Sequence, residues 1–158
     1  MEQIEEGVLV NDPSRPDLPV LTRSQVWAGL LMKAEDATKF VPMITYCKVI
    51  ERFENGFIRE INFRENSRIR ERVTFEPEKR VRFEQMDGPN QGGWVDNILD
   101  EDANGALRLR FVFGIPKGRA SEGPPRGGPE PGIDSIYRQA LESTLAAVRR
   151  QVQDGTLK

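Results

Sequence analysis

Six consecutive segments in which apolar and polar side chains alternate constrain the fold of this chain most strongly. Such alternation is typical of β-strands, and turn-forming residues such as Glu54-Asn55-Gly56 separate the segments. They are Tyr46–Phe53, Phe57–Arg64, Arg68–Phe75, Arg80–Met86, Gly93–Asp100 and Leu107–Ile115. Connections this short join consecutive strands in antiparallel order. The pattern therefore predicts an antiparallel meander, to which Gly7 to Asn11 add a seventh strand.

Helical patterns stand on both sides of this meander. Thr22 and Gln25 have the spacing of a capping box, and apolar residues follow at helical spacing, which predicts a helix over 22–35. A short helix is predicted over 37–41, ending before Pro42. After the meander, an apolar stripe predicts a long helix over 134–154. This order favours an α+β fold in which a seven-stranded antiparallel sheet wraps around the C-terminal helix.

The length of 158 residues fits a single domain over 1–158 with one hydrophobic core. Within this domain the segment 117–132 is rich in Gly and Pro and too poor in apolar residues to pack, which predicts a flexible loop. Its composition fits a mobile flap over a binding site and a simply disordered segment equally well.

Composition excludes several classes of function. A net charge of -2 lacks the general attraction that a nucleic-acid partner requires. The chain has no His and only one Cys, Cys47, so we expect no metal site, no internal disulfide and no cofactor. No stretch approaches the roughly 20 apolar residues of a membrane span, and no signal peptide is evident, which favours a cytoplasmic location. The sequence neither predicts nor excludes a homo-oligomer.

Several stretches of this sequence carry a family resemblance. They are Val10-Asn11, the run from Pro19 to Leu30, Lys33-Ala34-Glu35, Phe40-Val41-Pro42, Phe57 to Ile61, Arg70 to Val73, and Gly93-Trp94 with Asn97. They resemble the AtaL-like family, which lies in the START, polyketide-cyclase and birch-pollen-allergen-like (SRPBCC) superfamily. The resemblance implies a helix-grip fold with a hydrophobic ligand cavity between the sheet and the long helix. It supplies no catalytic residue, and the segment 117–132 matches no family feature.

Polar residues interrupt the apolar face of the predicted meander. Simple hairpin register places Glu51 opposite Arg59, Ile61 opposite Glu71, and Glu71 opposite Gln85. All of these residues share the parity of the apolar side chains, so they should face the interior. Because an isolated buried charge is costly, we expect Arg59 to bridge Glu51 and Glu71 while Gln85 completes the hydrogen bonds.

This predicted cluster has two interpretations. It could satisfy itself as a buried network or reach water at the rim, or it could anchor the polar group of a ligand. In the second case Glu71 is the candidate general base, and Arg59 steadies a developing oxyanion. The chemistry would then be cofactor-free cyclisation, dehydration or isomerisation of a polyketide- or lipid-like molecule. A non-catalytic carrier and a structural or oligomerisation module with a packed interior remain alternatives.

Other residues are predicted to contact a ligand or line its cavity. The ligand contacts are Asn97, Phe83, Phe111, Tyr137 and Leu141, and the wider lining adds Val49, Ile61, Val73 and Leu109. Asn97 is expected opposite Phe83 and Leu109, and Thr144 could add a hydroxyl. Cys47 should face inward and be inert, because no nearby cation is expected to lower its pKa. Outward parity places Arg72 between Glu60 and Glu84, in a solvated row of charges.

Overall fold

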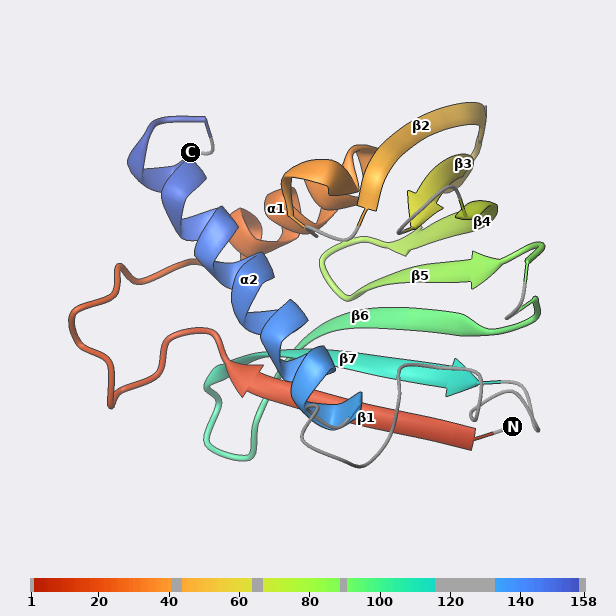
Figure 1. The fold of residues 1–158 in the computed structure, drawn as a ribbon. Coiled ribbons are helices and arrows are strands. Elements are labelled where there is room, and N and C mark those ends of the chain that lie inside the picture. The colour runs from red at the N-terminus through yellow and green to blue at the C-terminus, as the bar shows by residue number, and fades with distance from the viewer. Residues whose placement is uncertain (1, 41–43, 64–66, 89–90, 116–132, 157–158) are drawn as a thin grey trace.

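The computed structural model describes residues 2–40, 44–63, 67–88, 91–115 and 133–156 (Figure 1). The chain forms, in order, β1 (Glu2–Leu9), α1 (Arg23–Glu35), the single-turn 3-10 helix η1 (Ala37–Lys39), β2 (Ile44–Phe53), β3 (Gly56–Phe63), β4 (Ser67–Glu76), β5 (Arg80–Gln85), β6 (Trp94–Glu101), β7 (Leu107–Ile115) and α2 (Ile133–Gln153). This is the predicted order of elements. The segment 117–132 lies outside the described residues.

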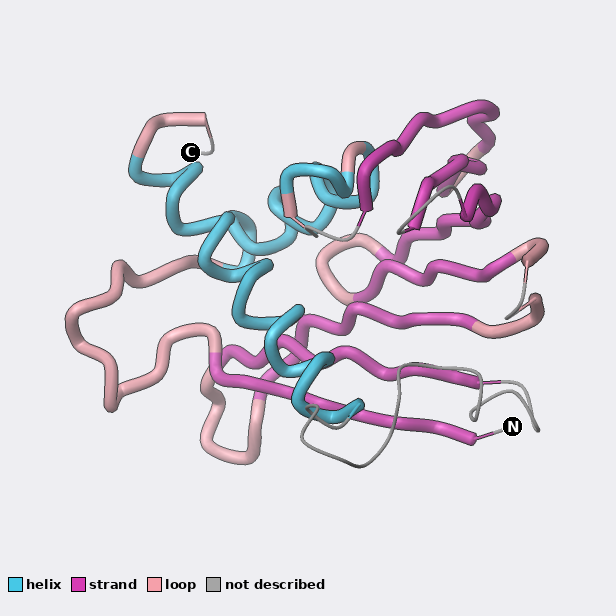
Figure 2. The backbone as a smooth tube through the Cα atoms, in the orientation of Figure 1, coloured by secondary structure: helices cyan, strands magenta, loops and turns pink. Residues whose placement is uncertain are grey.

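All seven strands form one antiparallel sheet in the order β1-β7-β6-β5-β4-β3-β2 (Figure 2). The predicted meander is confirmed, and β1 joins it by pairing with the last strand. The prediction for this seventh strand was displaced, because the strand spans Glu2–Leu9 and ends before Asn11. There the Asn11 side chain bonds both backbone polar groups of Leu21, each at 2.8 Å, which directs the chain away from the sheet.

Helix α1 begins where the sequence predicts. The Thr22 hydroxyl accepts from the Gln25 amide at 3.1 Å, and the Gln25 side chain accepts from the Thr22 amide at 2.9 Å, which completes the capping box. Asp36 ends α1 and caps η1 by accepting from the Thr38 amide at 3.1 Å. The predicted second helix is thus one 3-10 turn that ends at Lys39.

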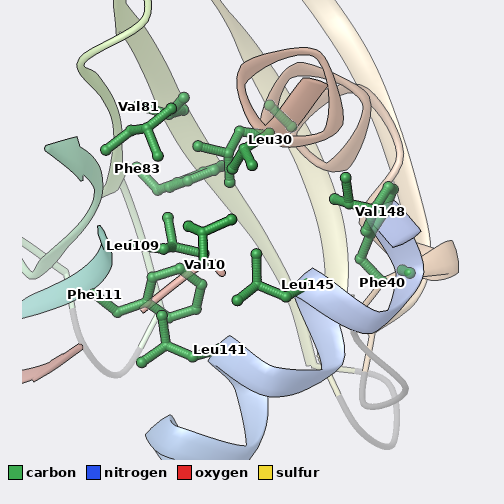
Figure 3. Packing of buried hydrophobic residues seen from close by; sticks show 14 of the residues in the cluster. Val10, Leu30, Phe40, Val81, Phe83, Leu109, Phe111, Leu141, Leu145 and Val148 are labelled. Carbon is green, nitrogen blue, oxygen red and sulfur yellow. The ribbon is translucent and has the colours of Figure 1, made fainter. Parts of the chain in front are cut away.

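Helix α2 crosses the inner face of the curved sheet, where it packs on β1, on β7 and against α1 (Figure 1). Figure 3 shows its apolar side chains, among them Leu141 and Leu145, directed toward Leu109 and Phe111 of the sheet. Together with Leu30 of α1 these residues belong to one buried cluster. Burial of this apolar surface is the main stabilising contribution to the fold, which is the predicted helix-grip arrangement.

Strand pairing differs from the prediction at specific places. The β2–β3 hairpin places Phe53 opposite Gly56, because its turn consists of two residues and Asn55 takes a φ of 69°. A further register shift lies between Val49 and Glu51, so that Val49 faces Arg59. The predicted Glu51–Arg59 pair is therefore wrong.

Three further strand pairs, β3–β4, β5–β6 and β6–β7, are shifted by two residues from the prediction. Arg59 lies opposite Glu71, where the prediction put Ile61 opposite Glu71. Asn97 lies opposite Val81 and Phe111, where the prediction put Phe83 and Leu109. A shift by two residues keeps every side chain on its face of the sheet. The predicted pairing of Glu71 with Gln85 is confirmed.

Candidate functional site

A row of polar residues crosses the inner face of the sheet. Arg59 on β3, Glu71 on β4 and Gln85 on β5 are successive cross-strand partners; we call these three residues the polar row. Apolar residues flank it on both sides. Phe57 and Val73 belong to the main hydrophobic cluster, whereas Ile61 and Ile69 belong to a second, smaller one. The polar row therefore separates two apolar parts of the interior.

Arg59 and Glu71 form a buried ion pair. Arg59 Nε and Nη2 lie 2.9 and 2.7 Å from Glu71 Oε1, and the two side chains are only 4% and 12% exposed. The guanidinium carbon also lies 4.6 Å from the centre of the Phe83 ring. Among the described residues, no hydrogen bond reaches Oε2 of Glu71. Arg59 thus fixes Oε1 of Glu71, whereas Oε2 remains available to accept a hydrogen bond or a proton.

Arg59 also holds the end of α1. Its Nη1 donates to the backbone oxygens of Lys33 at 3.2 Å and Ala34 at 2.9 Å, in the last turn of the helix. These carbonyls have no partner within the helix, and a cation near a helix C-terminus is electrostatically favourable. The self-satisfied interpretation of the cluster therefore describes Arg59 well, because this residue joins the sheet to α1.

Lys33 is a site residue that the sequence interpretation missed. Its Nζ donates to Asn97 Oδ1 at 2.8 Å and lies 4.3 Å from the centre of the Phe111 ring. The residue is 7% exposed, and among the described residues it has no carboxylate ion-pair partner. Burial, reinforced by the charge of Arg59 and opposed by that of Glu71, lowers the pKa of Lys33 from 10.5 to about 7.

A sequence signal for Lys33 does exist. The residue stands seven positions after Val26 and three after Leu30, so it lies on the apolar stripe of α1. Val26, Leu30 and Lys33 are all buried on the face of the helix that meets the sheet. A lysine at such a position either extends its amine to solvent or is buried, and spacing alone does not decide between the two.

Asn97 carries a buried hydrogen-bond donor that is not used. The residue is 1% exposed, its Oδ1 accepts from Lys33, and its Nδ2 has no partner within the described part of the chain. Leaving such a donor unpaired costs about 1–3 kcal/mol. An acceptor atom of a ligand placed beside Asn97 would recover this energy.

The structure separates the remaining predicted anchors from this centre. Glu51 is exposed, because the two-residue turn places it opposite Ile58 and not Arg59, so the predicted bridge from Arg59 to two glutamates is wrong. Gln85 is half-buried in the polar row, but its Nε2 donates to the Asp87 carbonyl at 3.1 Å. The structure therefore brings together Arg59, Glu71, Asn97 and Lys33.

Most of the predicted apolar lining lies in the core. Val73, Phe83, Leu109, Phe111 and Leu141 are buried in the main cluster. Ile61 belongs to the second cluster, and Val49 is half-buried. Thr144 Oγ1 donates to the Ala140 carbonyl at 2.8 Å, so this hydroxyl is used within its own helix. Tyr137 belongs to α2, but its side chain lies outside the described residues.

The predictions for Cys47 and Arg72 are partly wrong. Arg59 Nη1 lies 3.9 Å from Cys47 Sγ, so the expectation that no cation lies near this thiol is wrong. Arg72 faces Glu84 as predicted but has Ile58, not Glu60, on its other side.

Two kinds of feature are absent from the residues that the structure describes. Within them, no group of His, Cys, Asp and Glu residues is arranged to hold a metal ion. None of their helices combines the length and the apolar character needed to cross a membrane.

Comparison with known proteins gives one family and several structural neighbours. The family described as AtaL, acetylaranotin biosynthesis cluster protein L, matches residues 8–155. No curated protein matches the chain.

Among solved structures, the Zhui aromatase/cyclase from Streptomyces sp. R1128 aligns with a TM-score of 0.62 and 14% identity, over 96% of this chain and 95% of that one. The di-domain aromatase/cyclase StfQ of the steffimycin pathway aligns with a TM-score of 0.61 and 12% identity, over 98% of this chain and 52% of that one. A START superfamily protein from Mycobacterium smegmatis aligns with a TM-score of 0.60 and 12% identity, over 96% of this chain and 97% of that one. Identities this low establish a shared fold only.

Proposed function

The chain belongs to the AtaL family, that of acetylaranotin biosynthesis cluster protein L, and from this membership we propose that it binds a small, largely apolar molecule between the sheet and its helices. The observation that carries this proposal is the buried Nδ2 of Asn97, a hydrogen-bond donor with no partner among the described residues. Asn97 lies opposite Phe111 in the sheet, and its Oδ1 accepts from Lys33 Nζ, which lies over the rings of Phe83 and Phe111. Small-molecule sites commonly combine an apolar lining with a few polar groups that orient the ligand.

The chemistry around Asn97 favours a ligand with a carbonyl or phenol oxygen. Such an oxygen can accept from Nδ2, and an aromatic or polyketide-like body can pack on the rings of Phe83 and Phe111. The aromatase/cyclases Zhui and StfQ, whose names state their activity, support this ligand class for a chain of the same fold.

Catalysis at this site is a second part of the proposal. Glu71 Oε2 is the atom that can accept a proton from an enolisable substrate, while Oε1 is fixed by Arg59. Arg59 is engaged by Glu71 and by two carbonyls of α1, which favours a positioning role over direct contact with an oxyanion. The reaction class is cofactor-free cyclisation, dehydration or isomerisation. A carrier would use the same contacts without turnover.

The test is ligand-induced thermal stabilisation with a panel of naphthols, aromatic ketones and anthraquinones. A ligand that binds only the folded chain stabilises it by about 2.7 kcal/mol at 100 times its dissociation constant. We expect Asn97→Asp to weaken binding of carbonyl ligands at least roughly tenfold, because it keeps the acceptor for Lys33 and removes the free donor.

Asn104→Asp, in the exposed turn between β6 and β7, is the matched control and should bind as the wild type does. If no compound of the panel stabilises the wild-type chain, a structural or oligomerisation role with a packed interior is favoured instead.

A further inference from the structure

Lys33 is buried without a carboxylate counter-charge among the described residues. Nζ lies over the rings of Phe111 and Phe83, at 4.3 and 5.8 Å from their centres, and its hydrogen-bond partner is a neutral amide oxygen. Buried lysines that serve only a structural purpose are normally paired with a carboxylate. Among the described residues, the nearby carboxylate of Glu71 is engaged by Arg59 instead.

We propose that Lys33 Nζ is an amine nucleophile that condenses with the carbonyl carbon of a bound ketone, and that 1,3-dicarbonyl compounds are the favoured class. This inference rests on the proposed binding of apolar carbonyl ligands at the same place. Desolvation is an established way to activate a lysine as a nucleophile. The pKa of about 7 means that a large fraction of Lys33 is uncharged at neutral pH, so its lone pair is free to react.

The reaction balances without a co-reactant. The lone pair of Nζ forms a bond to the carbonyl carbon, and the carbonyl electrons move to the oxygen, which takes up a proton to give a carbinolamine. Loss of this oxygen as water, with two protons that came from the amine, leaves an imine. In a 1,3-dicarbonyl compound the imine then loses a proton from the central carbon and gains one on nitrogen. The product is a neutral conjugated enaminone.

Two features of the site favour this class of substrate over a simple ketone. The enaminone carries no charge, so it suits an interior in which charged groups are costly. Its second carbonyl oxygen provides the acceptor that Nδ2 of Asn97 lacks among the described residues. Asn97 thus contacts the amine through Oδ1 and can hold the substrate through Nδ2.

Acetylacetone, the smallest simple 1,3-diketone, tests the proposal with the full chain. At pH 7.5 we expect a mass gain of one diketone less one water, a new near-ultraviolet absorbance, and Lys33 as the modified residue in peptide mapping. Modification of Lys33 should be at least on the order of tenfold faster than that of Lys48 and Lys79, which are exposed. An exposed lysine has an ordinary pKa of about 10.4 and is almost fully protonated at this pH.

Variants and pH separate a reactive site from general reactivity. Lys33→Met should lose the adduct, and Lys48→Met, the matched control, should react as the wild type does. The reaction rate of Lys33 should rise with pH around a midpoint near 7, set by the charges of Arg59 and Glu71 and by burial. In wild-type protein unfolded in urea the preference for Lys33 should vanish, which keeps the test valid even if Lys33→Met folds poorly.

The outcomes distinguish this inference from the proposed function. If aromatic ligands stabilise the chain but Lys33 reacts no faster than Lys48, the proposal that Lys33 is a nucleophile is overturned. The proposal that the chain binds an apolar ligand is then retained. If Lys33 reacts selectively but no compound of the panel stabilises the chain, the activated amine is supported and the proposal of an apolar ligand fails.

Discussion

Gly29 of α1 lies directly against Val148 of α2. A Cβ atom at Gly29 would overlap Val148 Cγ2, so the two helices cross at a position where only glycine fits without displacement. Both residues are buried, and Val148 belongs to the main hydrophobic cluster (Figure 3). The absence of a side chain at Gly29 therefore sets how closely α1 and α2 approach each other.

We expect Gly29→Ala to lower the free energy of unfolding by about 1–2 kcal/mol, because overpacking outweighs the better helix propensity of alanine. Urea denaturation measures this change. Val148→Ala should partly relieve the overlap, so the double variant should be more stable than the sum of the two single losses predicts. If the loss of the double variant equals the sum of the two single losses, there is no steric overlap between the two positions.

The buried pair Arg59–Glu71 should matter more than the exposed pair Arg52–Glu35. Glu71→Gln leaves a buried guanidinium without its counter-charge, and we expect a loss of about 3–5 kcal/mol in the free energy of unfolding. Glu35→Gln removes one charge from a pair in which the Arg52 side chain is 62% exposed and the Glu35 side chain is 45% exposed. The loss in the free energy of unfolding should therefore stay below about 1 kcal/mol. Denaturant unfolding of both variants checks this order, and equal losses would contradict it.

Lys33 should make stability depend on pH in the alkaline range. Its pKa is about 7 in the folded chain and near 10.5 when unfolded, so between these values the unfolded chain binds more protons. Stability should therefore rise with pH by up to about 1.4 kcal/mol per unit in this window, and the burial penalty should be largest below pH 7.

The difference in unfolding free energy between wild type and Lys33→Met, measured from pH 6 to pH 10, isolates this contribution. The variant should be the more stable protein at pH 6, and the advantage should shrink as the pH rises. A difference that does not vary with pH would mean that the amine keeps an ordinary pKa.

Arg59 should protect the last turn of α1. A lysine at this position offers one ammonium group, which cannot reproduce the planar contacts to Glu71 and to the carbonyls of Lys33 and Ala34. We expect Arg59→Lys to accelerate amide hydrogen exchange in that turn roughly tenfold, equivalent to about 1.4 kcal/mol. Arg72→Lys, at an exposed position on β4, serves as the control and should leave this exchange unchanged.

The sequence predicted which side chains face inward better than it predicted which ones meet. Arg59, Glu71 and Asn97 are buried as expected, although the β3–β4 pairing and both pairings of Asn97 differ from the prediction by two residues. A shift of two residues leaves each side chain on the same face of the sheet, so these register errors did not change which residues were predicted to be buried. The prediction for Glu51 was wrong because the β2–β3 turn has two residues, not the three of Glu54-Asn55-Gly56, and this shift by one residue turns Glu51 to the opposite face.

Lys33 shows a different limit of sequence interpretation. A charged residue on a helix is ordinarily read as facing solvent, and the spacing that places Lys33 on the apolar stripe does not show where its amine ends. That position depends on Asn97, which lies 64 residues later in the chain. The pairing of a helix side chain with a distant strand is decided by tertiary packing, which no local pattern contains.

The pairing of β1 with β7 has a consequence for synthesis on the ribosome. The first strand made has its hydrogen-bonding partner in the last strand of the sheet, and α2, which packs on both, is made later still. The remaining strands can form hairpins with their neighbours as they emerge, whereas β1 must wait unpaired. Contacts this distant in sequence slow folding and leave strand edges exposed. Strand β1 therefore stays unpaired until β7 and α2 have been made, and it is the segment that a chaperone would most need to shield.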